Sequence, residues 1–203
     1  MNLKYIFSRL LKKSRGVATS NSFIDKTSKL ESGTTFIDSS MQRHSFCGYD
    51  CNINNTAIGS FCCIASNVNI GGASHPMEYL SMSPVFLSHR DSVKSKFARH
   101  HYKYIPETVI GHDVWIGQGV YIKSGIKVGN GVVIGMGSVL TKDVGDYEIW
   151  AGNPAVKIGQ RFNNDIINAM QVFAWWDLDD AQLTEVGPFI TNPESLLKKK
   201  GLL

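Results

Sequence analysis

The segment from residue 110 to residue 145 repeats a six-residue pattern, and this repeat limits the possible fold more than any other feature of the chain. Each of its six units begins with an aliphatic residue: Ile110, Ile116, Ile122, Val128, Ile134 and Leu140. Glycine follows in four units, and the fifth position is apolar in five of the six. A period of six fits neither an α-helix nor the two-residue alternation of a simple strand. It predicts short strands joined by tight corners, as in a parallel β-helix.

The same pattern continues upstream, where it becomes distinct near Met41. The spacing from Ile53 to Ile58 is one residue short of a full unit, which predicts a shortened corner there. Inward positions of the repeat are occupied by Cys47, Cys51 and Cys62, whereas Cys63 points outward. We interpret the three inward cysteines as buried thiols, because a free cysteine packs like a small apolar residue. No Cys-x-x-Cys pair is present, so a zinc ribbon is not expected.

Residues 76–107 interrupt the repeat, which then resumes in phase at Ile110. Loops of this length inside a compact domain are uncommon and usually functional. We therefore predict that residues 76–107 form an excursion from the coil and fold over a site. The β-helix domain as a whole is predicted to span residues 34–154.

An amphipathic helix and a polar connector are predicted for residues 1–33, with the connector over residues 19–33. The apolar positions of the helix follow helical spacing: Leu3, Ile6, Phe7, Leu10 and Leu11. Such a helix could cover one end of the coil, and its basic residues also allow a weak contact of residues 1–15 with a membrane surface.

A helical cap is predicted for residues 155–203. Asn163 or Asn164 can begin a helix there, and we expect this helix to cover the open sheet edge at the end of the coil. A second short helix is predicted to begin within residues 177–180, and residues 198–200 are predicted to be a charged tail.

The length of 203 residues favours one compact protein, and its net charge of +4 does not require an anionic partner. We expect no nucleic-acid partner. No apolar run approaches the roughly 20 residues of a membrane-spanning helix. Arg9, Lys12 and Lys13 interrupt the only candidate signal-peptide core, so a cytoplasmic location is expected.

His75 is the strongest candidate for a catalytic residue. It occupies the last, outward position of a hexad, where the chain leaves the coil for the long excursion. A histidine titrates near neutral pH and can therefore act as a general base. The alternative is a surface histidine beside a loop.

Several motifs that occur in order carry a resemblance to a known family. They are Gly72–Pro76, Ser81–Phe86, Gly111–Gly117, Thr141–Asp143, Gly152–Ala155, Arg161-Phe162 and Trp175–Asp177. The set resembles the xenobiotic acetyltransferase branch of the hexapeptide-repeat acyltransferases. That branch includes type B chloramphenicol and streptogramin acetyltransferases and many bacterial polysaccharide O-acetyltransferases. The resemblance implies an all-β fold, a left-handed parallel β-helix with three hexads in each coil.

The resemblance also implies a reaction, a co-substrate and an assembly. His75 would take a proton from an acceptor hydroxyl for direct attack on acetyl-CoA, without a covalent enzyme intermediate. The implied assembly is a homotrimer with each site between two subunits. Residues implied to bind acetyl-CoA by motif match are Trp115, Gly117, Gln118, Gly135, Met136, Thr141 and Lys142. The alternative for Trp115 is packing between subunits. The alternative for Lys142 is a solvated position on the surface.

The acceptor is implied less directly, by the segment around the candidate base. Antibiotic-modifying members carry an Asn-His-Arg-Met-Asp-like segment, whereas this chain has Ser-His-Pro-Met-Glu at residues 74–78. The difference favours a saccharide hydroxyl, on a cell-surface polysaccharide or its precursor, over chloramphenicol or a streptogramin. Candidate acceptor-binding residues are Met77, Glu78, Tyr79, Ser83 and Phe86.

Two other classes of function remain possible at this point. A carbonic anhydrase of the β-helix type holds zinc with histidines that include a His-x4-His pair, and none of the six histidines here forms one. We therefore expect no metal. A non-catalytic, CoA-binding β-helix scaffold is the second alternative.

Overall fold

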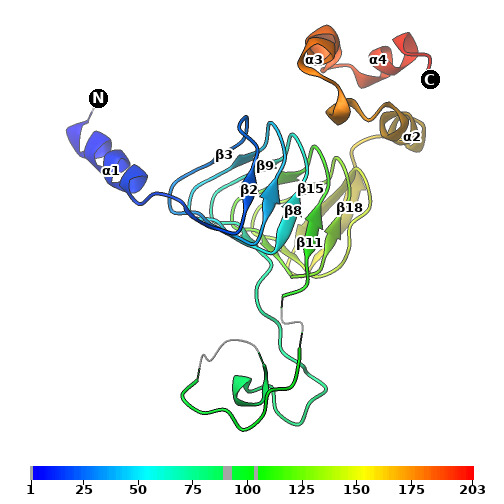
Figure 1. Cartoon of the computed structure of the whole chain (residues 1–203). Helices are drawn as coiled ribbons and strands as arrows, with labels where there is room; N and C mark the ends of the chain where they lie inside the picture. The colour runs from blue at the N-terminus through cyan, green and yellow to red at the C-terminus, as the bar shows by residue number, and fades with distance from the viewer. Residues whose placement is uncertain (1, 89–92, 103–104) are drawn as a thin grey trace.

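The computed structural model describes residues 2–88, 93–102 and 105–203, and most of them form a left-handed parallel β-helix (Figure 1). Its three faces are called sheets A, B and C. Sheet A contains β1 (Ala18–Ser20), β4 (Thr35–Ile37), β7 (Asn52–Asn54), β10 (Asn69–Ile70), β13 (Tyr121–Ile122) and β16 (Val139–Leu140). Sheet B contains β2 (Phe23–Ile24), β5 (Ser40–Met41), β8 (Thr56–Ile58), β11 (Thr108–Ile110) and β14 (Lys127–Val128). Sheet C contains β3 (Lys29–Leu30), β6 (Phe46–Cys47), β9 (Cys63–Ile64), β12 (Trp115–Ile116), β15 (Val133–Ile134), β17 (Glu148–Gly152) and β18 (Ala155–Gln160).

The repeat predicted the core of this coil. The first position of every hexad from Ile110 to Leu140 is buried, and the fifth positions are buried as well. Cys47, Cys51 and Cys62 also lie in the core, whereas Cys63 is exposed, as predicted. Successive coils place equivalent residues directly above one another, because the strands pair in parallel without a shift: Cys47 with Ile64, Ile64 with Ile116, and Ile116 with Ile134.

The coil begins earlier than the sequence predicted. Residues 19–33 are part of the first coil, whose strands β1, β2 and β3 pair with β4, β5 and β6, and not a connector. The corners between sheets A and B explain why the pattern was missed. They turn through Asn21, Asp38 and Asn55, all at positive φ, where short polar side chains replace the expected glycine. The five-residue spacing of Ile53 and Ile58 also separates Phe36 from Met41.

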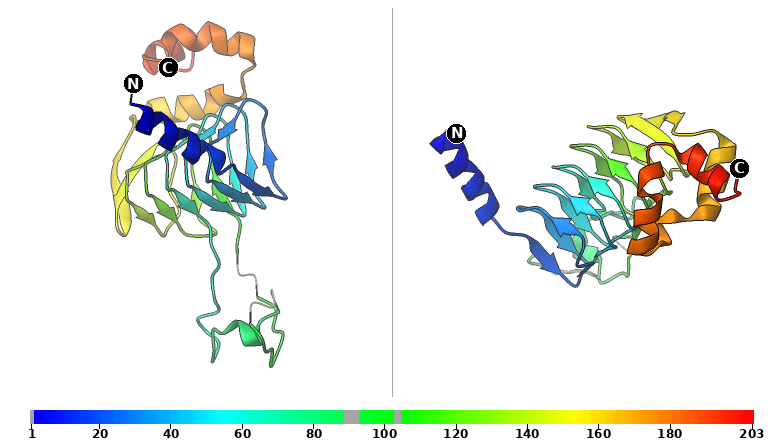
Figure 2. Two further views of the ribbon diagram at one scale, coloured as in Figure 1. Left: turned by 90° about the vertical axis from the view of Figure 1, so that its left-hand side faces the viewer. Right: turned by 90° about the horizontal axis from the view of Figure 1, so that it is seen from above.

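The long excursion leaves the coil between β10 and β11, at the corner between sheets A and B. Its return is fixed by Asn55, whose side-chain amide donates to the carbonyl of Ile105 at 2.8 Å. Between these points the chain extends away from the coil and contains a short 3₁₀ helix, η1 (Pro84–Phe86) (Figures 1 and 2). The predicted lid therefore does not fold back over the coil of its own chain.

The helices after the coil begin largely where the sequence predicted. α2 (Asn164–Phe173) starts at Asn163, whose side chain accepts a hydrogen bond from the backbone of Ile166. The 3₁₀ helix η2 (Trp175–Asp177) and α3 (Asp180–Val186) follow, and Asp179 and Gln182 form a capping box for α3. After η3 (Gly187–Phe189), the predicted charged tail is instead the last turn of α4 (Pro193–Lys199).

The C-terminal segment packs against the corner between sheets B and C. Trp176 stacks on His112 with ring centroids 5.3 Å apart, and Arg43 donates to the carbonyl of Trp176 at 2.8 Å. Burial lowers the pKa of His112 below its ordinary value, although Asp177 acts in the opposite direction. At the end of sheet C, β18 pairs antiparallel with β17. The predicted helix, α2, packs through Ile167 and Met170 on Tyr147 at the last corner of the coil.

At the other end, α1 (Leu3–Ser14) begins after Asn2, whose side chain accepts a hydrogen bond from the backbone of Lys4. Figures 1 and 2 show α1 extending away from the coil, so it does not cover the end of the coil. Within the described ranges, every helix is too short or too polar to cross a membrane.

Candidate functional site

The position of His75 is set by the two glycines that turn the chain out of the coil. Gly71 and Gly72 have φ values of +85° and +110°, which an L-residue with a side chain rarely adopts. A Cβ atom at Gly71 would also lie 2.4 Å from the carbonyl oxygen of Asn54 on the preceding coil. His75 follows four residues after Gly71 and is exposed, beside the corner between sheets A and B.

The imidazole of His75 is oriented by the backbone of the excursion. Its Nδ1 atom lies 2.8 Å from the carbonyl oxygen of Met82. A carbonyl oxygen only accepts hydrogen bonds, so Nδ1 must carry the proton and donate it. In the neutral ring Nε2 is then unprotonated, which is the form that a general base requires. No residue type signals Met82 in this role, because the contact is made through a backbone atom.

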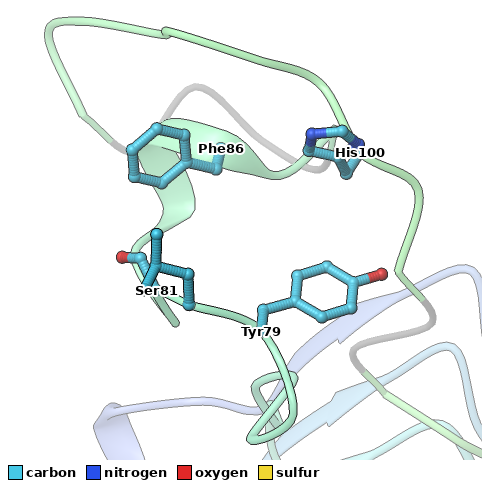
Figure 3. Close-up of a pocket in the computed structure, with 5 residues that line it drawn as sticks. Tyr79, Ser81, Phe86 and His100 are labelled. Carbon is cyan, nitrogen blue, oxygen red and sulfur yellow. The ribbon is translucent and has the colours of Figure 1, made fainter.

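A cavity of about 370 Å³ lies in the excursion (Figure 3). The described residues that line it are Tyr79, Leu80, Ser81, Phe86 and His100. The two limbs of the loop are held together around it by backbone hydrogen bonds, since the N–H of His100 donates to the carbonyl of Phe86 at 2.9 Å. The ring of Tyr79 meets that of His100 edge-on, with centroids 6.5 Å apart. The result is a largely apolar hollow with hydroxyl and imidazole groups at its rim.

The predicted acceptor-binding residues are only partly brought together in this cavity. Tyr79 and Phe86 line it. Ser83 instead begins η1, where its hydroxyl accepts from the backbone of Val85 at 3.4 Å. Met77 and Glu78 are exposed and are not part of the lining. Leu80, Ser81 and His100 were missed, because the pairing of distant loop segments leaves no periodic signal in the sequence.

Five of the seven predicted CoA-binding residues meet at one edge, the corner between sheets C and A. Trp115 projects outward from β12 just before it, and Gly117 and Gln118 form the corner itself. Gly135 and Met136 form the same corner one coil later, where the N–H of Gly137 donates to the carbonyl of Gln118 at 2.8 Å. Trp115, Gln118 and Met136 are exposed.

The glycines at this corner have two different roles. A Cβ atom at Gly117 would lie 2.6 Å from the backbone nitrogen of Met136, so coil stacking alone requires glycine there. By contrast, added Cβ atoms at Gly119 and Gly137 would meet nothing within 4 Å. These two residues leave an open strip of backbone that a narrow chain can approach. The sequence does not distinguish them, because Gly125 and Gly131 occupy the same fourth position of the hexad but are crowded by Pro106 and Tyr147.

Thr141 and Lys142 lie apart from this group. They follow β16 and are exposed at the corner between sheets A and B, the edge from which the excursion also leaves. Within one chain, the width of sheet A separates this edge from the corner of Trp115, Gln118 and Met136. The single chain therefore divides the predicted site between two edges of the coil.

Three of the motifs behind the resemblance meet outside the candidate site. Arg161 donates to a carboxylate oxygen of Asp113 at 2.8 Å and to the carbonyl of Gly131 at 2.9 Å. Burial raises the pKa of Asp113, against the effect of Arg161, which lowers it. Together with the stack of His112 on Trp176, this pair attaches the C-terminal segment to the coil. In the part of the chain that the structure describes, no three metal-binding side chains cluster around a common point.

Comparison with known proteins finds similarity to a hexapeptide transferase family and to acetyltransferases. The model of the bacterial transferase hexapeptide family (six repeats) matches residues 107–142. A protein of Lysinibacillus sphaericus described as a probable macrolide acetyltransferase is 32% identical over 71% of this chain and 78% of its own length. A chloramphenicol acetyltransferase of Escherichia coli is 37% identical over 66% of this chain. This chain spans 65% of that relative's length, which is less than two thirds.

A solved structure also resembles this chain. The polySia-specific acetyltransferase NeuO superposes with a TM-score of 0.54 at 27% sequence identity, covering 72% of this chain and 66% of NeuO.

Proposed function

We propose that this chain, which belongs to the hexapeptide-repeat acetyltransferases, transfers an acetyl group from acetyl-CoA to a hydroxyl group, with His75 as the general base. The observation that carries the proposal is the contact between His75 Nδ1 and the Met82 carbonyl oxygen. This contact selects one tautomer of the neutral imidazole and leaves Nε2 able to accept a proton. A histidine that served only as a surface residue would not need a fixed tautomer.

The mechanism assigns each proton transfer to His75. Nε2 accepts the proton of the acceptor hydroxyl as that oxygen bonds to the acetyl carbon. The imidazolium that results is stabilised by its Nδ1–H donation to Met82 and then returns the proton to the departing sulfur. When bound, acetyl-CoA supplies the acetyl group as an activated thioester. His75 forms no covalent bond to the acetyl group in this scheme, so the transfer is direct.

The strip at the corner between sheets C and A fits a pantetheine arm. Gly119 and Gly137 present open backbone without a side chain, and Gln118 and Met136 stand exposed beside it. A narrow polar chain that can pair with backbone groups is the kind of ligand that such a strip can accept. In the same proposal Trp115 borders the strip, and Thr141 and Lys142 at the other edge serve the polar end of the co-substrate.

A site divided between two edges requires a second subunit, and we place each site between two copies in a homotrimer. An outward ladder on sheet C supports this assembly. It runs through Phe46, Cys63, Trp115 and Val133, which pair with one another in register. Phe46 and Trp115 are exposed in the single chain, by 41% and 53% respectively. A contiguous apolar strip of this kind is typical of a surface that another protein covers.

A charge placed in this ladder should dissociate the assembly. We expect Phe46→Glu to convert the trimer into monomers, because it buries a carboxylate in an apolar contact. Phe23→Glu is the matched control, since Phe23 is 55% exposed but lies on sheet B. Light scattering during size-exclusion chromatography measures the mass of each variant. Equal masses for Phe46→Glu and the unmodified protein would rule out sheet C as the interface.

For the acceptor we propose a saccharide hydroxyl, on a cell-surface polysaccharide or its precursor. The cavity of the excursion combines aromatic faces of Tyr79 and Phe86 with polar groups of Ser81 and His100. Apolar surfaces with a few polar groups at fixed positions are typical of small-molecule sites, and aromatic rings pack well against sugar rings. Similarity to NeuO points in the same direction. The second candidate is an antibiotic acceptor, which the chloramphenicol and macrolide acetyltransferases among the relatives favour.

The acceptor is tested by a screen with mass spectrometry. The enzyme and acetyl-CoA are incubated with a panel of sugars, nucleotide sugars and oligosaccharides, and separately with chloramphenicol, a macrolide and a streptogramin. We expect an added acetyl group on a saccharide. Acetylation of an antibiotic alone would replace the saccharide proposal by the second candidate. Binding of CoA without acetylation of any acceptor would instead favour a non-catalytic scaffold.

A further inference from the structure

α1 separates apolar and basic side chains on opposite sides of one short helix. At 3.6 residues per turn, Leu3, Phe7, Leu10 and Leu11 share one side. All four are exposed, from 54% for Leu11 to 82% for Leu3. The remaining circumference carries the basic residues of the segment: Lys4, Arg9, Lys12, Lys13 and Arg15. No acidic residue occurs before Asp25.

The contacts of α1 with the coil fix which side faces outward. Lys12 Nζ lies 3.6 Å from a carboxylate oxygen of Asp50 and 4.2 Å from the ring centre of Tyr49. Arg15 pairs with Asp50 at 2.5 Å. Lys12 lies half a turn around the helix from Leu3, so the polar side is the one attached to the coil. The apolar stripe of Leu3, Phe7, Leu10 and Leu11 is consequently turned away from the coil.

From this arrangement we propose that α1 docks the protein on the surface of an anionic lipid bilayer. The four apolar side chains insert at the boundary between headgroups and acyl chains. Lys4 and Lys13 border the stripe on its two sides, so their long side chains can reach lipid phosphates while their stems stay apolar. Each basic residue near the surface is attracted by the negative potential of anionic lipid. This inference is independent of the proposed acetyl transfer.

Charge also decides against pairing of α1 with the same helix of another copy. Such a pair would bring two sets of basic residues together, and the first 24 residues provide no carboxylate to neutralise them. An anionic bilayer provides both the apolar phase for the stripe and the negative charge for its borders. An anionic lipid surface is therefore the partner that matches both the apolar stripe and the basic borders of α1.

The experiment uses the full-length protein and sedimentation with lipid vesicles. We expect it to sediment with vesicles that contain phosphatidylglycerol, to bind phosphatidylcholine vesicles far more weakly, and to be released by high salt. Two variants add the same charge on opposite sides of the helix. Leu10→Glu should lower binding about 50-fold, because it removes a buried leucine as well as adding a charge, whereas Ser8→Glu should lower it only about fivefold.

Other outcomes would overturn the proposal. Absence of sedimentation with anionic vesicles would exclude a lipid surface as the partner. Equal losses for Leu10→Glu and Ser8→Glu would show that charge alone drives binding and that the stripe does not insert. A fall in the oligomeric mass of Leu10→Glu, measured by light scattering, would identify a second copy as the occupant. Far-ultraviolet circular dichroism verifies that both variants remain folded.

Discussion

Replacing His75 with alanine should lower kcat/KM for acetyl transfer by about 10³-fold, the middle of the range for loss of a general base. The residual rate would come from positioning of the two substrates, which the variant retains. Thermal stability should change little, because His75 is exposed and makes its hydrogen bond to a loop carbonyl. The rate is measured with the acceptor identified by mass spectrometry, and binding of CoA is measured separately by calorimetry.

The matched control for this prediction is His100→Ala. His100 lies in the same excursion but lines the cavity, where its ring meets that of Tyr79 edge-on. If the cavity binds the acceptor, His100→Ala should raise KM for the acceptor by about tenfold, with a smaller effect on kcat. A His75→Ala variant that retained more than a tenth of the activity would contradict the proposed mechanism. Equal kinetic effects of the two substitutions would remove the distinction between base and binding residue.

The six-residue period identified the coils whose corners contain glycine. It failed where asparagine or aspartate takes the place of glycine at a corner. From Ile110 to Leu140 every predicted inward position is buried, because a parallel coil without register shifts keeps equivalent residues in one column. The first coil was missed since Asn21, and Asp38 one coil later, take the left-handed backbone conformation that glycine takes in later corners. Asparagine and aspartate adopt this conformation at a small cost, so a glycine-based pattern undercounts such corners.

Some single residues of the candidate site could be selected from the sequence, but their arrangement could not. His75 could be selected because it stands where the repeat stops. Its partner Met82 acts through a carbonyl oxygen, which no residue type signals. His112, Asp113 and Trp176 belong to the motifs that carry the resemblance, yet in the structure they attach the C-terminal segment to the coil. Trp115 and Lys142 lie at two different edges because their hexads contribute to different sheets. The hexads look alike in sequence, so this separation was not apparent from the motifs.

Replacing Gly117 with alanine should lower the free energy of unfolding by roughly 3 kcal/mol, the upper part of the usual range for overpacking. The added methyl group would lie 2.6 Å from the backbone nitrogen and 2.8 Å from the Cα atom of Met136. Backbone of a paired coil cannot move aside as a side-chain tip can, so the two coils must separate locally. For a protein of this size, the melting temperature should fall by about 6–12 °C, as measured by calorimetry.

Gly187→Ala provides the control, because a Cβ atom there meets nothing within 4 Å and its backbone is right-handed. Its melting temperature should be unchanged or slightly higher. The comparison also separates a stacking role of Gly117 from the CoA-binding role that the resemblance implies. A stacking role predicts a lower melting temperature, with CoA affinity reduced only in proportion to unfolding. If Gly117→Ala instead kept its melting temperature and lost CoA affinity, glycine would be required there by the ligand and not by the next coil.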